Sequence, residues 1–418
     1  MSMIKTMRIL TLALLVSNFL CFLYPARDTP LGQIGVSASL SGSYDSRVFG
    51  VSSNLFNASR SGSNPNIPSE ELESEDDFIL KFSPAVYFTK KISLLKLSGS
   101  AGVEIAQFVK NSDKSYVIPI TTLVIDFDET LSKNKRFSNN AKIRFDATFD
   151  VGQQVGASIL EQDLVSYTYF TSGLNFRYNH STKFGIGAGT NYTYRHYQSG
   201  STGPRPYSDL SSLPLHARAF YIYSEKLDLF TEYSYTVSKS HKSSTGQSLA
   251  DSSSHAISFG VNGDISPKLS GIASVGYSHL NFDNAMTASQ QTIISSLTLN
   301  WKYNQKTSSN FSLSRSFIPS AQGFSNLSTS ALFKVNHRFI ENLTGSGYVT
   351  AGFSEYTYPN TNTLEDGSSF SNYGFGFSIR KLINKFFSTS GGYDFSYIDR
   401  GSEDFARHVL QIQMTGKF

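Results

Sequence analysis

The feature that most constrains this chain is a two-residue period in hydrophobicity, which recurs from residue 33 to the C-terminus. Residues 141–151 show it best, because apolar side chains alternate there with Lys142, Arg144 and Asp146. Successive side chains of a β-strand point to opposite faces, so this pattern puts every charge on one face. A helix would distribute the same charges around its surface. The chain is therefore predicted to be all-β.

The alternation divides the chain into eighteen segments of strand length. An even number of strands returns both termini to the same side, as in single-chain bacterial barrels. The sequence therefore predicts a closed antiparallel transmembrane β-barrel. Its predicted strands are 33–44, 78–90, 94–109, 116–127, 137–151, 164–178, 183–197, 212–224, 227–239, 253–264, 268–282, 291–303, 309–318, 327–339, 343–357, 370–381, 386–399 and 405–418.

Short and long connections alternate between these segments. Outer-membrane barrels have short turns on the periplasmic side and long loops outside the cell. Every short turn follows an even-numbered segment, so both termini are predicted to be periplasmic. The connection at 128–136 is longer than the other short ones. The long connections are 45–77, 198–211, 240–252 and 358–369, and the first is a long extracellular loop.

Composition agrees with a strand-based membrane protein. The chain has 33 Phe and 23 Tyr residues but a mean hydropathy of −0.21. No stretch after residue 26 holds eighteen apolar residues, so helical membrane spans are not expected. Strands with one lipid face and one wet face fit both facts. Aromatic residues also gather near strand ends, as interfacial girdles do, for example at Trp301, Tyr303 and Phe339 near the turns and at Tyr233 and Tyr277 near the loops.

The N-terminus is typical of a secretory signal peptide. Lys5 and Arg8 precede an apolar stretch at 9–24, and residues 1–26 are predicted to be removed near Ala26. The single cysteine, Cys21, lies in this segment, so a disulfide or thiol catalyst is not expected in the mature barrel (27–418). These features predict the outer membrane of a Gram-negative bacterium.

The chain ends with an aromatic residue, Phe418, on the apolar face of the last segment. A terminal aromatic residue of this kind resembles the signal by which outer-membrane barrels are recognised and inserted. Phe418 is therefore the candidate assembly signal. The expected partners are the barrel assembly machinery, outer-membrane lipid and lipopolysaccharide.

Signals for catalysis, cofactors and metals are weak. The eight histidines are scattered and show neither HxH nor HExxH spacing. Gly185, Gly187 and Gly189 lack the strand-to-helix context of a phosphate-binding loop, and they predict a strand face with minimal side chains. The net charge of +4 is dispersed, which argues against nucleic acid as a partner. The chain is not expected to be an enzyme or to hold a cofactor.

Charges of both signs occupy the polar faces of the segments. A cation on a lipid face near the membrane midplane would cost ~2–4 kcal/mol, so these side chains should face the lumen. They form either a selectivity surface or a ladder of ion pairs that stiffens the wall. Arg144 and Arg218 lie near mid-segment and are the best candidates for contact with an anionic solute. The candidate lumen residues are Lys142, Arg144, Asp146, Arg218, Glu232, Glu104, Arg338 and Arg380, with Arg177, Asp228 and Lys334 on the same faces.

The connection 45–77 ends in an acidic run. Such a run could bind divalent cations beside lipopolysaccharide, fold inward to narrow a pore, or form an ordinary solvated loop. The acids are Glu70, Glu71, Glu73, Glu75, Asp76 and Asp77.

Two motifs flank this loop, Tyr44–Phe49 and Asp77–Pro84. They resemble motifs of outer-membrane β-barrel porins associated with exopolysaccharide gene clusters, although Arg47 stands where that family commonly has a small polar residue. The strand count is also similar to that of the eighteen-stranded alginate exporter. The resemblance implies passive passage of a secreted polysaccharide or another hydrophilic solute, with polysaccharide export components as partners. A general or nutrient diffusion porin and a structural or adhesion barrel are the alternatives.

Overall fold

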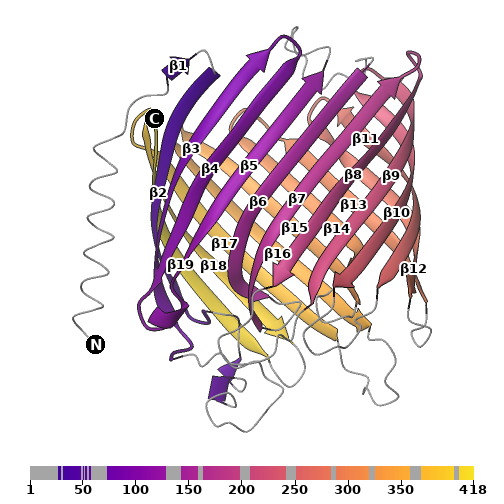
Figure 1. Cartoon of the computed structure of the whole chain (residues 1–418). Coiled ribbons are helices and arrows are strands. Elements are labelled where there is room, and N and C mark those ends of the chain that lie inside the picture. Colours follow the sequence, from indigo (N-terminus) through magenta and orange to yellow (C-terminus); the bar gives the residue numbers. More distant parts are fainter. Residues whose placement is uncertain are drawn as a thin grey trace.

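The computed structural model shows a closed β-barrel (Figure 1). The structure describes residues 27–29, 32–48, 50, 52–53, 56–57, 73–128, 143–158, 163–197, 208–241, 251–283, 289–319, 325–357, 369–399 and 404–418. Within these residues, eighteen long strands and one short strand form a single sheet. The strands are β1 (Arg27–Thr29), β2 (Gly32–Asp45), β3 (Asp77–Ile92), β4 (Leu95–Phe108), β5 (Tyr116–Asp128), β6 (Ile143–Ser158), β7 (Asp163–Asn179), β8 (Phe184–Tyr197), β9 (Asp209–Ser224), β10 (Leu227–His241), β11 (Ser252–Ser266), β12 (Leu269–Phe282), β13 (Gln290–Lys302), β14 (Thr307–Pro319), β15 (Ser325–Ile340), β16 (Leu343–Thr357), β17 (Ser369–Leu382), β18 (Phe387–Asp399) and β19 (Phe405–Lys417).

Pairing between the first and last long strands closes the barrel. Each strand from β2 to β19 pairs antiparallel with the next, and β19 pairs with β2 from Val409 opposite Asp45 to Lys417 opposite Ser37. The backbone N–H of Phe418 extends this ladder by donating to the carbonyl of Val36 at 2.8 Å. The predicted eighteen-stranded barrel is therefore confirmed.

The two ends of the barrel differ in their connections. Short turns such as 93–94 and 225–226 lie at one end together with β1 and the C-terminus (Figure 1). We call this the turn end, and the opposite end, where β2 leads into the 45–77 connection, the loop end. By the rule for outer-membrane barrels, the turn end faces the periplasm. No helix among the described residues is long and apolar enough to cross a membrane.

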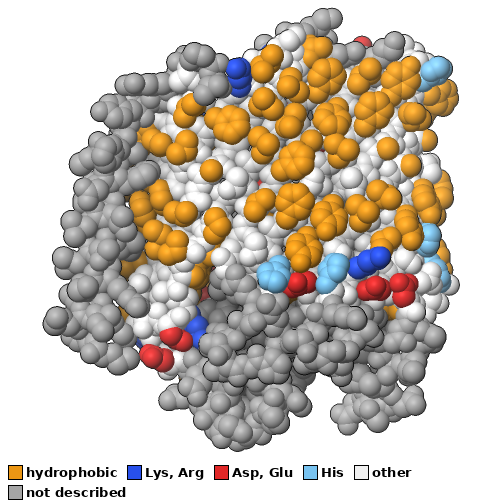
Figure 2. Space-filling view, in the orientation of Figure 1, with side chains coloured by type: hydrophobic (Ala, Val, Ile, Leu, Met, Phe, Trp, Pro, Cys, Tyr) orange, Lys and Arg blue, Asp and Glu red, His pale blue; other side chains and the backbone are white. Residues whose placement is uncertain are grey.

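The wall has an apolar outer face and a polar inner face. Figure 2 shows a broad band of hydrophobic side chains across the part of the outer face that is in view. Many of them are exposed at this face, for example Phe259, Ile293 and Ile412 at 57%, 64% and 71%. At the turn end, Trp301 and Tyr303 stack on this face with ring centroids 4.6 Å apart. This arrangement fits a lipid-facing band with an aromatic girdle.

The strand boundaries differ from the predicted ones at β6. The alternation suggests an end at residue 151, but the strand continues to Ser158, which lies opposite Asp163 of β7. Small and polar residues follow one another after Val151, so the period of two is lost although the backbone pairing continues. The short strand β1 was not predicted either. The predicted signal peptide, residue Lys142 and most of the 128–136 connection lie outside the described residues.

Candidate functional site

The inner face of β8 carries no side chains in its half nearer the turn end, and side chains of the neighbouring strands cross it there. Gly185, Gly187 and Gly189 face inward, and an added Cβ at Gly187 would meet the ring of Phe220 at 3.0 Å. The predicted strand face with minimal side chains is therefore present, and side chains from β7 and β9 cover it. The glycines let neighbouring long side chains lie flat against the wall.

Arg177 of β7 uses this space to reach β10, three strands away. Its Nη1 donates to Oδ2 of Asp228 at 2.5 Å, and its guanidinium lies 4.2 Å from the centroid of the Phe220 ring. Asp228 is completely buried, and the Arg177 side chain is 13% exposed. The buried carboxylate is thus matched by a cation, and the ion pair links β7 to β10 across β8 and β9.

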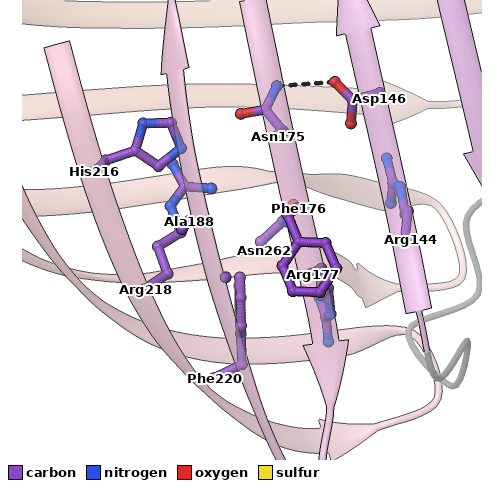
Figure 3. A pocket seen from close by; sticks show the side chains of 11 residues that line it. Arg144, Asp146, Asn175, Phe176, Arg177, Ala188, His216, Arg218, Phe220 and Asn262 are labelled. Carbon is purple, nitrogen blue, oxygen red and sulfur yellow. Dashed lines mark hydrogen bonds between the residues drawn. The ribbon is translucent and has the colours of Figure 1, made fainter.

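Three of the predicted lumen residues gather at one pocket above this ion pair. Arg144 and Asp146 come from β6 and Arg218 from β9, and Figure 3 shows their side chains around the pocket. The pocket has a volume of about 280 Å³. Asn175 donates to Asp146 at 2.8 Å. The pocket is lined by Arg144, Asp146, Asn175, Phe176, Arg177, Gly187, Ala188, His216, Arg218, Phe220 and Asn262.

The charges of this region neutralise one another. Arg218 lies directly opposite Glu232 and forms an ion pair with it, and its guanidinium lies 5.1 Å from the ring centroid of Phe230. We call the inner faces of β6–β10 the charged wall. Of the two sequence interpretations, Arg218 and Glu232 have the geometry of the ion-pair ladder. Whether Arg144 or Arg218 also contacts an anionic solute stays a prediction.

Glu104 belongs to a separate cluster on β3–β5, nearer the loop end. Its carboxylate accepts from Lys81 at 3.2 Å and from the Tyr116 hydroxyl at 2.9 Å. It therefore takes part in a local polar cluster and does not contribute to the pocket of Arg144.

The opposite side of the lumen, formed by the inner faces of β13–β19, is mostly uncharged. We call it the hydroxyl wall. Its hydroxyls bond to one another across strands, for example Ser314 to Ser330 and Ser346 to Ser378, each at 2.8 Å. The inward-facing residues of this wall include Ser296, Thr298, Ser312, Ser314, Ser328, Ser330, Ser346, Thr350, Ser378, Ser390, Ser396, Gln411 and Gln413.

Arg338 and Arg380 lie on the hydroxyl wall, at the turn end. Both side chains are exposed. Arg338 donates to the carbonyl of Gln305 at 3.2 Å, and Arg380 donates to the Ser388 hydroxyl at 3.2 Å. The structure thus separates these two predicted residues from the pocket of Arg144 and Arg218.

The described part of the 45–77 loop packs against the inner wall. Val48 and Phe56 form a buried cluster with Ile79, Ala106 and Phe108, whose side chains belong to the inward faces of β3 and β4. Of the three possibilities for this loop, the described residues therefore show an inward fold.

The base of the loop is held by its acids. Asp77, which is fully buried, accepts from the backbone N–H groups of Val109, Lys110 and Asn111 at 2.7–3.0 Å. Asp76 accepts from Lys110 Nζ at 2.6 Å, and this hydrogen bond holds the pKa of the Asp76 carboxyl below its usual value. These two acids serve the loop structure, and the described residues contain no cluster of three or more potential metal ligands.

The motif at residues 44–49 also stabilises the pairing of β19 with β2, which we call the seam. Asp45 is 3% exposed and accepts from Arg407 of β19, whose Nη2 lies 2.5 Å from Oδ2. Arg47 forms an ion pair with Glu75 across the loop base. The residues that carry the sequence resemblance are therefore structural ties between β2, the loop and β19.

At the other end of the seam, Phe418 is packed rather than lipid-exposed. Its ring is 9% exposed and stacks on Phe386 with centroids 5.4 Å apart. Its carbonyl accepts from the Tyr87 hydroxyl at 2.8 Å and from the backbone N–H of Val36 at 3.0 Å. These contacts place it at the closure of the barrel.

Comparison with known proteins identifies a family. The model of the family described as "Putative beta-barrel porin 2" matches residues 123–418. The motifs at 44–49 and 77–84 lie outside that match, so their association with exopolysaccharide gene clusters stays a prediction. No curated protein sequence matches the chain.

Solved outer-membrane proteins have similar structures at low identity. OccAB4 of Acinetobacter baumannii is 13% identical with a TM-score of 0.46, covering 93% of this chain and 100% of its own. OccK2 (OpdF) of Pseudomonas aeruginosa is 9% identical with a TM-score of 0.47, covering 92% and 98%. A structure titled "Bacterial polysaccharide outer membrane secretin" is 12% identical with a TM-score of 0.34, covering 92% and 98%.

Proposed function

The chain belongs to the "Putative beta-barrel porin 2" family of outer-membrane barrels, and from this premise we propose that it is a passive pore for a hydroxyl-rich polymer, with a secreted polysaccharide as its cargo. The observation that carries the proposal is the hydroxyl wall. A wall of Ser, Thr and Gln side chains both donates and accepts hydrogen bonds. It can therefore exchange partners with successive sugar hydroxyls as a chain moves.

The charged wall is compatible with this function. Its ion pairs, Arg177 with Asp228 and Arg218 with Glu232, join strands of the same side of the barrel. They run along the wall and do not cross the lumen. Eighteen-stranded barrels are wide enough to enclose an aqueous channel. The ion pairs then stiffen the wall without presenting one dominant sign of charge to the polymer.

Solute uptake tests the proposal. Purified barrel would be reconstituted into liposomes, and swelling would be followed with maltose, maltohexaose and a dextran fraction. Heat-unfolded protein in the same lipid is the control. We expect swelling with the hexasaccharide at a rate well above the control. Failure of folded barrel to admit any of these sugars would contradict a polymer pore.

A general or nutrient diffusion porin is the second candidate, and the inward packing of Val48 and Phe56 favours it. A loop inside the lumen narrows the passage, which suits small solutes. The same liposomes separate the two functions. Entry of maltose without maltohexaose would support the diffusion porin, whereas entry of both supports the polymer pore.

A further inference from the structure

Four cations at the turn end of the hydroxyl wall form an arc. They are Lys302 of β13, Arg338 of β15, Arg380 of β17 and Lys417 of β19, and all four are exposed. Each lies near the turn end of its strand, since β13 ends at Lys302, β19 ends at Lys417, and Arg338 and Arg380 both lie opposite Thr344 of β16. We call this set the cationic crescent.

The cations of the crescent are not neutralised. None of the four forms an ion pair with a described residue; Arg338 and Arg380 bond only to neutral groups, and Lys417 lies 4.5 Å from the ring centroid of Tyr87. The inward faces of β13–β19 carry one acid, Asp394, which lies deeper and accepts from Tyr348 at 2.6 Å. Glu341, in the 341–342 turn, lies beside this mouth, and Asp28 of β1 lies at the same end of the barrel.

The opposite mouth lacks such a feature on the same strands. At the loop end, Arg407 is the cation on the inward faces of β13–β19, and it is paired with Asp45. Lys334 of β15 also faces inward, four residues deeper than Arg338, so the described cations of the hydroxyl wall are densest toward the turn end, at the periplasmic mouth. Alternate strands are about 10 Å apart, close to the Debye length of ~8 Å at physiological salt, so neighbouring cations of the crescent act together on a flexible polyanion.

We propose that the cationic crescent captures a polymer bearing carboxylate groups at the periplasmic mouth. This inference rests on the proposed pore and specifies its cargo as an acidic polysaccharide. The crescent supplies the attraction that starts entry, and the hydroxyl wall then contacts the sugar rings. Electrostatic focusing of this kind raises association rates by about 10- to 1,000-fold and weakens with salt.

Single-channel recording tests capture directly. Oligogalacturonate is the anionic probe and maltopentaose the neutral one, each added to one side of a planar bilayer. A Glu341→Cys substitution, labelled by an impermeant thiol reagent, reports which side holds the turn end. We expect oligogalacturonate to block the current more often from the turn end than from the loop end at 0.1 M KCl. The difference should vanish at 1 M KCl, where the Debye length is about 3 Å.

Neutralising the crescent is the decisive variant. In Lys302→Gln/Arg338→Gln/Arg380→Gln/Lys417→Gln, the capture rate of oligogalacturonate from the turn end should fall about tenfold or more, with maltopentaose unchanged. The charge-preserving set Lys302→Arg/Arg338→Lys/Arg380→Lys/Lys417→Arg should retain capture. Four lysines in the short turns provide a matched control at the same end, Lys183→Gln/Lys268→Gln/Lys306→Gln/Lys385→Gln, and should change capture by less than about twofold.

The outcomes distinguish failure of the proposed capture role from failure of the proposed pore function. The proposed capture role is contradicted if wild type and the four-Gln variant capture oligogalacturonate at the same rate. It is also contradicted if the capture rate of maltopentaose falls as much as that of oligogalacturonate. Neither result contradicts the pore itself. A barrel that never conducts overturns the pore. In that case, calorimetric titration of detergent-solubilised barrel with oligogalacturonate tests whether the crescent binds a polyanion, independently of conduction. Binding by wild type and loss of binding in the Gln crescent support it, and no binding by wild type overturns it.

Discussion

The charged wall and the hydroxyl wall use cations in opposite ways. On β6–β10, Arg177 and Arg218 are held by acids and by aromatic rings, and Asp228 is fully buried. On β13–β19, Arg338 and Arg380 are exposed and bond to neutral oxygens. The charged wall thus presents less net charge to the lumen than its ionisable residues alone would suggest. The difference teaches that pairing, and not the number of ionisable residues, identifies the surface that can act on a solute.

The largest effect is expected at the seam that joins the hydroxyl wall to β2. Deleting Phe418 removes two backbone hydrogen bonds to Val36 and the ring stacked on Phe386. Most of the folded barrel should be lost from the outer membrane, as seen by heat-modified mobility on gels. The conservative Phe418→Tyr keeps an aromatic ring and is the control. Normal amounts of folded barrel after the deletion would exclude an assembly role.

Arginine-to-methionine substitutions test the contrast between the walls. Arg177→Met leaves Asp228 buried without its cation and should lower the free energy of unfolding by about 3–5 kcal/mol. Arg338→Met on the hydroxyl wall should change it by less than about 0.5 kcal/mol. Urea unfolding in lipid vesicles, followed by the fluorescence of Trp301, the single tryptophan, measures both. An equal loss in the free energy of unfolding for the two variants would contradict the distinction between paired and unpaired cations.

The smallest effect concerns pH at the base of the 45–77 loop. Lys110 lowers the pKa of the Asp76 carboxyl, so this pair contributes stability above the unfolded-state pKa of an aspartate, ~3.9, and loses it as pH falls through the lower folded value. The hydrogen bond to Asp76 also raises the pKa of Lys110, so the stability from this pair is lost again only when the pH rises through that raised pKa. Both groups are solvent-accessible, so the effect should be slight.

The matched variant for this pair is Asp76→Asn. It should unfold at a slightly lower urea concentration than wild type at pH 7, and this difference should shrink as the pH falls through the folded-state pKa of Asp76. A gap that widens on acidification would show that the pair does not act in this way.

Sequence alone predicts the barrel because each segment repeats the same two-residue period and the connections alternate in length. It fails after Val151, where both faces are small or polar. The Arg177–Asp228 pair could not be predicted, because β7 and β10 are three strands apart and only the glycines of β8 allow them to meet. Lys302 and Lys417 share the polar face of their strands, but their grouping with Arg338 and Arg380 at one mouth depends on where the strands end.

The reversal potential under a KCl gradient tests the central claim most directly. That claim is that the barrel is a water-filled pore whose unpaired crescent, and not its paired charges, sets ion preference. Neutralising the crescent to Gln at all four positions should shift the reversal potential toward cation preference, whereas Arg218→Gln/Glu232→Gln should leave it unchanged. A barrel that shows no conductance, or a shift produced by the paired variant and not by the crescent, would contradict the account.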